Sequence, residues 1–204
     1  ILNDSTIILE PSIGQGDLVQ YIKEKNQNIN FDMYEIDTTI KILKGIAKNK
    51  IIYGDFMKQK ITKKYKTIIG NPPYIRTTKG NLYIDFIEKC YHLLQTNGEL
   101  IFIIPSDFFK LTSASNLIHT MILNGTFTHI YHPHNERLFE KASIDIMVFR
   151  YCKNPDLEKI ILINKEKKYL IHTNGIITFS DIPIKHTKKI SDYFDVYVGM
   201  VTGK

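Results

Sequence analysis

Short, isoleucine-rich apolar runs alternate with amphipathic segments along the chain, and this alternation limits the folds it can adopt. Short apolar runs bounded by turn residues are typical of buried strands. The runs that precede the middle of the chain cover residues 6–10, 30–37, 50–55, 65–70 and 99–105. Because these runs are apolar throughout and helical patterns separate them, they predict a mainly parallel sheet with helices on both faces.

The segments between the runs carry apolar residues at helical spacing. We expect the third helix to end at Asn97-Gly98 and the fourth at Asn124-Gly125, since glycine and asparagine commonly follow helices. The four expected helix faces are Leu18, Tyr21 and Ile22; then Ile40, Leu43 and Ala47; then Tyr83, Phe86, Ile87, Cys90 and Leu94; and finally Ala114, Leu117, Ile118 and Met121.

Two further strands, at 127–132 and 143–151, have no helical pattern between them. They therefore predict an antiparallel hairpin, which we expect at one edge of the sheet. The fold class expected from the whole pattern is α/β: a Rossmann-like, doubly wound, mostly parallel sheet of seven strands. After residue 153 the pattern changes to a β-hairpin over 159–172, so we expect a boundary between residues 1–153 and 154–204.

The composition gives little information about which class of molecule the chain binds. A formal net charge of +6 fits a polyanion such as nucleic acid, and it also fits an ordinary soluble protein. Cys90 and Cys152 lie far apart and have no metal-ligand or disulfide spacing. No apolar run reaches membrane-spanning length, so we expect no membrane partner. The chain begins almost directly in a strand and ends without closing an element, so we expect a piece of a longer protein.

The stretch "LEPSIGQG" ends the first strand and starts a helix. Its glycines, Gly14 and Gly16, allow a close approach of the backbone to a ligand, although an ordinary strand-to-helix turn has the same pattern. Glu35 and Asp55-Phe56 follow the next two strands. Because the carboxyl ends of parallel strands share one edge, these side chains and Glu10 predict a nucleoside pocket. Val19 replaces the third glycine of a dinucleotide fingerprint, which favours a nucleoside without a pyrophosphate.

The fourth strand ends in "NPPY". Pro72 removes a backbone donor and holds Asn71 extended, so the Asn71 side-chain oxygen and the Pro72 carbonyl can act as neighbouring acceptors. Two acceptors suit an amino group with two N–H bonds, and Tyr74 offers a ring for stacking. The motif therefore predicts a site for an amino group attached to a flat substrate.

In this order and spacing, "LEPSIGQG", "YEID", "GDF" and "NPPY" resemble the S-adenosylmethionine-dependent amino-methyltransferases. The particular resemblance is to restriction-modification-like DNA adenine-N6 methyltransferases whose cofactor motifs precede the target-recognition domain. Residues 138–151, "LFEKASIDIMVFRY", resemble the late motif of that family. The resemblance covers Ile7 to about Tyr151. It implies a catalytic domain at 1–153 without its first helix, and a hairpin extension with the start of a target-recognition region at 154–204.

The resemblance also implies residue roles. Asn71 and the Pro72 carbonyl would bind the target N6 amino group, while Tyr74 and Phe139 would stack on an adenine flipped out of double-stranded DNA. S-adenosylmethionine would be the cofactor, and no metal is expected. A nuclease, fused or separate, would lie outside this segment of a cytoplasmic enzyme of prokaryotic or viral origin. The residues expected to bind the cofactor are Glu10, Pro11, Ser12, Gly14, Gly16, Glu35, Asp55 and Phe56.

Three alternatives stay open. Methyltransferases that act on a protein glutamine amide also carry NPPY, because that amide has the same amino group. An rRNA amino-methyltransferase and a non-catalytic nucleic-acid-binding fragment are the others. Phe139, together with the roughly fifty residues after Tyr151, favours DNA. His129, His132 and His134 lie at a strand end and in a loop, and we expect them to face solvent. The loop with Arg76 and Lys79 could contact phosphates or simply be solvated.

Overall fold

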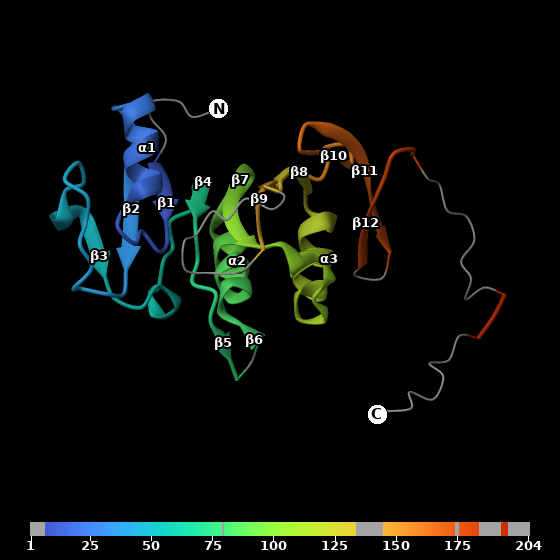
Figure 1. The fold of residues 1–204 in the computed structure, drawn as a ribbon, viewed down its shortest axis with the longest axis horizontal. Coiled ribbons are helices and arrows are strands. Elements are labelled where there is room, and N and C mark those ends of the chain that lie inside the picture. Colours follow the sequence, from blue (N-terminus) through green and yellow to red (C-terminus); the bar gives the residue numbers. More distant parts are fainter. Residues whose placement is uncertain (1–6, 79, 134–144, 174–175, 184–192, 196–204) are drawn as a thin grey trace.

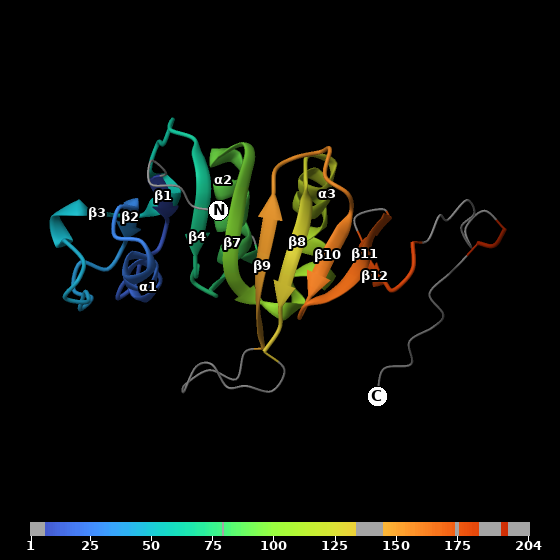
Figure 2. The same cartoon turned by 90° about the horizontal axis from the view of Figure 1, so that it is seen from above.

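The computed structural model describes residues 7–78, 80–133, 145–173, 176–183 and 193–195. Its centre is a ten-stranded sheet with the order β12-β11-β10-β8-β9-β7-β4-β1-β2-β3 (Figures 1 and 2). The strands are β1 (Ile7–Glu10), β2 (Asn30–Glu35), β3 (Ile51–Tyr53), β4 (Tyr65–Gly70), β7 (Leu94–Pro105), β8 (Thr126–Tyr131), β9 (Ile146–Cys152), β10 (Ile160–Ile163), β11 (Glu166–Thr173) and β12 (Ile176–Ser180). A separate small hairpin pairs β5 (Arg76–Thr77) with β6 (Gly80–Asn81).

The pairing is parallel from β3 through β2, β1 and β4 to β7. Strand β9 is antiparallel to both of its neighbours, β7 and β8, as the sequence predicts for the last two strands of the expected sheet. The expected hairpin at 159–172 is confirmed as β10 and β11.

Two expectations about the sheet are wrong. The described sheet has ten strands rather than seven, and the β8–β9 hairpin is not at its edge, because β10 pairs in parallel with β8 and β11 and β12 follow. Edge backbone groups of a strand can accept a further strand, and β10 uses those of β8. Whether residues 154–204 form a unit of their own stays a prediction.

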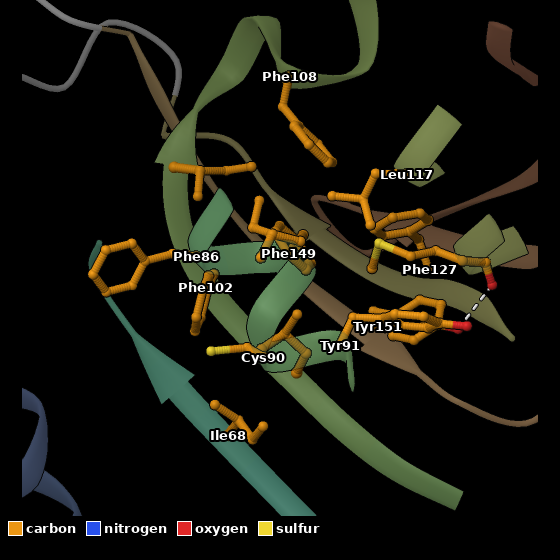
Figure 3. Packing of buried hydrophobic residues seen from close by; sticks show 14 of the residues in the cluster. Ile68, Phe86, Cys90, Tyr91, Phe102, Phe108, Leu117, Phe127, Phe149 and Tyr151 are labelled. Atoms are coloured by element: carbon orange, nitrogen blue, oxygen red, sulfur yellow. Dashed lines mark hydrogen bonds between the residues drawn. The ribbon is translucent and has the colours of Figure 1, made fainter. Parts of the chain in front are cut away.

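Helices cover both faces of the sheet. Helix α1 (Asp17–Lys25) lies on one face, and α2 (Leu82–Leu93) and α3 (Ser115–Leu123) lie on the other. Successive residues of a strand point to opposite faces. Accordingly Ile8 packs in the cluster that contains Val19 of α1, whereas Leu9 packs in the cluster that contains Ile87 of α2. Figure 3 shows the larger cluster, in which aromatic rings of β7, β8 and β9 meet α2.

The helical expectations are confirmed in part. Helices α2 and α3 form as predicted, and Asn124 caps α3. However, α2 ends at Leu93, and β7 begins at the next residue instead of after Asn97-Gly98. In α1 the buried residue is Val19, while Tyr21 is exposed.

The helix expected from Ile40 to Ala47 is absent, and a short 3-10 turn, Lys48–Lys50, follows an irregular segment. In this segment Ile42 and Ile46 are buried. Among the described residues, no helix is long and apolar enough to cross a membrane.

Candidate active site

A cavity of about 530 Å³ opens beside the carboxyl ends of β1, β2, β3 and β4. Strand order reverses between β1 and β4, since the chain continues from β1 toward β3 and from β4 toward β7. Ligands of doubly wound folds bind outside such a switch point. The lining residues are Pro11, Ser12, Gly14, Glu35, Ile36, Asp37, Ile40, Gly54, Asp55, Phe56, Met57, Asn71, Pro73, Ile75, Leu82 and Phe86.

The Glu35 carboxylate is fixed by three main-chain donors. Its Oε2 accepts from the Gly14 N–H at 2.8 Å, and its Oε1 accepts from the N–H groups of Ile36 and Asp37, both at 2.9 Å. An ionised carboxylate offers about four acceptor positions, so it retains acceptor capacity. Because Gly14 follows β1 and Glu35 ends β2, these bonds join the turns of two neighbouring strands into one rigid wall.

The two glycines of the turn after β1 have different structural roles. Gly14 has a φ of 58° and lines the cavity, so it brings main chain close to the space where a ligand would lie. Gly16 has a φ of 102°, precedes α1, and leaves room for the Ile46 side chain, which a Cβ would overlap. Gly16 therefore serves packing and does not line the cavity.

Glu10 lies beneath the cavity rather than on its surface. Its side chain is 1% exposed, and its Oε1 accepts from the Ser12 N–H at 3.1 Å. Burial raises the pKa of Glu10 to about 8; the Ser12 bond opposes this shift and the nearby Glu35 charge adds to it. The Ser12 hydroxyl in turn donates to the main-chain oxygen of Asn71 at 3.3 Å, which links the β1 turn to the end of β4.

Asp55 and Phe56, which follow β3, also line the cavity. Asp55 caps the 3-10 turn Phe56–Lys58, since its Oδ1 accepts from the Met57 N–H at 2.9 Å. The Phe56 ring is 3% exposed and packs against Tyr34 and Phe86, with ring centroids 5.2 and 5.3 Å away. This side of the cavity is therefore a fixed ring with a carboxylate next to it.

Asn71 and Pro73 line the cavity from the end of β4, whereas Pro72 is buried. The Tyr74 hydroxyl lies 2.6 Å from Asn71 Oδ1 and 3.0 Å from the main-chain oxygen of Ile103, and it donates its single proton to one of them at a time. Burial raises the pKa of Tyr74, which keeps the hydroxyl a donor. The Tyr74 ring meets Tyr83 edge-on at 6.1 Å.

The structure thus brings together on one cavity most of the predicted site: Pro11, Ser12, Gly14, Glu35, Asp55, Phe56 and Asn71. Glu10, Gly16, Pro72 and Tyr74 do not line this cavity, and Phe139 lies outside the described residues. His134 and Lys79 also lie outside the described residues. Nε2 of His132 lies 2.9 Å from Oδ2 of Asp145. Nowhere in the described ranges do three potential ligand side chains gather as a metal site.

Sequence reasoning missed the apolar part of the lining. Ile36 directly follows Glu35 and is 68% exposed, an unusual position for a large apolar side chain. Its position directly after the acidic residue that ends β2 could have indicated from the sequence that Ile36 lines the cavity. Leu82 and Phe86 could not be separated from the packing face of α2, because both are apolar residues at helical spacing.

A central parallel sheet, the antiparallel strand β9 and a cavity at the β1–β4 switch point together define a Rossmann-like methyltransferase fold. The structure is similar to that of a protein of Listeria monocytogenes assigned to the class I S-adenosylmethionine-dependent methyltransferases (TM-score 0.59, 14% identity, covering 79% of this chain and 59% of that one). It is also similar to a type I restriction-modification methyltransferase subunit of Streptococcus thermophilus (TM-score 0.61, 14% identity, covering 86% and 45%).

The sequence profile of the Eco57I restriction-modification methylase family matches residues 14–139. The chain belongs to this family. It is 31% identical over 197 residues to the Type II methyltransferase M.HincII of Haemophilus influenzae, which covers 85% of this chain. It is 26% identical over 173 residues to the Type II methyltransferase M.TthHB8I of Thermus thermophilus, which covers 72%. The chain spans 38% and 39% of the length of these two relatives.

Proposed function

We propose that this chain carries the cofactor-binding and methyl-transferring part of a DNA methyltransferase, the modification activity of a restriction-modification system. The methyl donor is S-adenosylmethionine, and the acceptor is the N6 amino group of an adenine flipped out of the duplex. The observation that carries the proposal is that Asn71 shares one cavity with Glu35 and Asp55. An amine-binding motif and a nucleoside-binding wall thus face the same space.

The cavity fits the nucleoside part of the donor. Its volume lies within the range of about 300–1,000 Å³ typical of small-molecule sites. The Glu35 carboxylate, with remaining acceptor positions, suits a ribose diol. Asp55 suits an adenine amino group, and Phe56 gives the base an apolar contact surface. Pro11, Ser12 and Gly14 would border the remaining part of the molecule, above the buried Glu10 and Gly16.

The amine end of the cavity is built on Asn71. Its Oδ1 would accept one N6–H bond, and the neighbouring Pro72 carbonyl would accept the other. Held in this way, the nitrogen lone pair is less delocalised into the purine ring and can point at the donor. The Tyr74 hydroxyl, 2.6 Å from Asn71 Oδ1, would fix which way the amide faces. We propose stacking on the flipped base for the Tyr74 ring and for Phe139.

When bound, S-adenosylmethionine supplies an electrophilic methyl group on sulfur. Asn71 and the Pro72 carbonyl would hold the acceptor nitrogen toward that methyl group; the methylated amine would lose one proton to solvent, and S-adenosylhomocysteine would be the leaving product. The chain needs no nucleophile of its own, so its contribution is position and electrostatics. Flipping the base costs a few kcal/mol, and stacking on an aromatic ring returns about 1–3 kcal/mol.

Methyl transfer from isotopically labelled S-adenosylmethionine to unmethylated DNA tests the proposal. Asn71→Ala should lower the rate on the order of 10²–10³-fold, the usual cost of removing one transition-state contact, while donor binding is retained. Asp55→Ala should weaken donor binding instead. Asn28→Ala is a matched control, because Asn28 is exposed and lies two residues before β2, away from the end of β2 that carries Glu35.

RNA and a protein glutamine substrate are the competing acceptors in the same assay. Transfer to either of them in preference to DNA would reject the assignment of the acceptor. Undiminished transfer by Asn71→Ala would reject the assignment of the amine site.

A further inference from the structure

We propose that Lys89, on α2, is a positioning residue. It holds the turn after Asp55 and thereby fixes the positions of Asp55 and Phe56, which with Glu35 form what we call the nucleoside subsite. The inference rests on the proposed function, because it concerns the same cavity. Lys89 itself does not line that cavity. Its effect on a ligand would pass entirely through Asp55 and Phe56.

The Lys89 ammonium is saturated by main-chain oxygens of this turn. Its Nζ lies 2.5 Å from the Phe56 oxygen, 2.8 Å from the Gln59 oxygen and 3.2 Å from the Met57 oxygen. An ammonium has three N–H donors, and here each has one acceptor. The other main-chain hydrogen bonds of the turn are local; for example, the Gln59 N–H donates to the Phe56 oxygen at 3.2 Å. Lys89 therefore ties the main chain of this turn to α2, in addition to the stacking of Phe56 on Phe86 of the same helix.

The same ammonium also fixes the Phe56 ring. Lys89 Nζ lies 4.6 Å from the ring centroid, within the range of a cation–π interaction. Tyr34 meets the ring edge-on and Phe86 stacks on it. The ring therefore has contacts from β2, from α2 and from the ammonium, which leaves it little freedom to tilt. Lys89 therefore helps to set the position and tilt of the Phe56 ring, against which a bound base would lie.

The main chain transmits the effect to Asp55. The Asp55 Oδ1 accepts from the Met57 N–H at 2.9 Å, and the Lys58 N–H donates to the Asp55 oxygen at 3.0 Å. Both donors belong to the segment whose carbonyls Lys89 holds. Glu35 ends β2, and its main-chain oxygen accepts from the Gly54 N–H at 2.8 Å, so Gly54 stays tied to β2 without Lys89. Releasing the carbonyls beyond Asp55 would let the Asp55 side chain shift relative to Glu35. A ligand that needs both carboxylates at once would then bind less tightly.

Lys153, which directly follows β9, offers a matched comparison because it contacts the end of the same helix. The Lys153 Nζ lies 3.1 Å from the Tyr91 oxygen, 3.5 Å from the Leu94 oxygen and 4.3 Å from the Tyr91 ring centroid. It thus makes the same kinds of contact as Lys89, but at the end of α2 and away from the cavity lining. Loss of either lysine should lower stability, but only loss of Lys89 should affect the nucleoside subsite.

The experiment measures the Kd of S-adenosylhomocysteine by calorimetry, together with Tm, for the wild type, Lys89→Met and Lys153→Met. We expect Lys89→Met to raise Kd by about tenfold or more, since charge-assisted contacts that position two ligand groups are lost. Lys153→Met should lower Tm while Kd stays within about twofold of the wild type. In the double variant Asp55→Ala Lys89→Met, the fold-increase in Kd should be smaller than the product of the two single-variant fold-increases. The reason is that both substitutions act on the position of the same carboxylate.

An unchanged Kd in Lys89→Met would overturn the role of Lys89 and leave the proposed function standing. A wild-type chain that does not bind S-adenosylhomocysteine would overturn both. If Lys89→Met does not fold, Lys89→Arg takes its place. A planar guanidinium cannot direct three donors from one atom at these three oxygens, so its Kd should also rise, and an unchanged value would equally reject the proposal.

Discussion

Glu10 illustrates how one buried group can tie stability to pH. The side chain is 1% exposed, and burial raises its pKa to about 8. The folded chain therefore keeps this carboxyl protonated at pH values where the unfolded chain has lost the proton. A group of this kind contributes most to stability below its unfolded pKa of 4.5, and the contribution falls as pH rises to about 8.

Glu10→Gln replaces the protonated acid by a neutral amide of similar shape. The wild type should lose free energy of unfolding relative to this variant as pH rises from 5 to 8, by at most about 1.4 kcal/mol per pH unit. Denaturant unfolding of both proteins across this range measures the difference. A difference that stays constant with pH would show that Glu10 is ionised in the folded chain.

At the scale of elements, the junction between α3 and β8 leaves no room for a side chain. A Cβ on Gly125 would overlap the main-chain oxygen of Cys152 and the Tyr151 hydroxyl. That hydroxyl donates to the Met121 oxygen of α3 at 2.7 Å (Figure 3), and Lys159 Nζ lies 2.6 Å from the Gly125 oxygen. The helix, two central strands and the start of β10 are therefore fixed around one glycine.

Gly125→Ala should destabilise the chain by about 1–3 kcal/mol, the usual cost of forcing an extra methyl group into a packed site. Gly45→Ala is the matched control: a Cβ there meets nothing within 4 Å, so its stability should change by no more than about 0.5 kcal/mol. Thermal unfolding of the two variants compares them directly. Equal stability would mean that the junction can open without cost.

The elements also show what the sequence could predict. Strands β1 and β4 and the second half of β7 were predictable, because strands buried on both faces carry mainly apolar residues. The segment 40–47 was not, because three apolar residues at helical spacing fit an irregular segment equally well. Its structure is set by tertiary contacts: the Leu43 N–H donates to the Gln15 oxygen at 3.0 Å, and Ile46 packs on Gly16. Such contacts leave no periodic signal in the sequence.

The same distinction holds for the candidate site. Asn71, Glu35 and Asp55 were predictable as one group, since the carboxyl ends of parallel strands meet at one edge. The contacts of the Tyr74 hydroxyl with Ile103 and of Lys89 with the turn after Asp55 were not. They depend on where β7 and α2 lie in space relative to those strand ends.

In the whole molecule, the described strands after residue 153 share a core with the strands before it. In the structure Ile161, Leu170 and Ile177 are buried in the main core cluster. Phe179 also meets Phe109 edge-on, with ring centroids 5.8 Å apart. These contacts make β10, β11 and β12 part of the packing of the first 153 residues.

A chain that ends at Lys153 should therefore be less stable than the full chain, since it exposes the edge of β8 and part of the core. A chain that ends at Pro183 keeps every described strand and is the control. Circular dichroism during heating, with light scattering to detect aggregation, compares the two. If the shorter chain unfolds at the same temperature as the control, residues 154–183 are an independent unit.

The reversal of strand order between β1 and β4 has a practical consequence. The Glu35 and Asp55 side of the cavity lies in the chain before β4, and the Asn71 side lies after the lysine-containing connection that ends at Lys64. A single tryptic cut in that connection would leave the two sides on different fragments, joined by the β1–β4 strand pair and by Lys89. If an added nucleoside keeps the two fragments associated under conditions in which they otherwise separate, both fragments hold the same ligand.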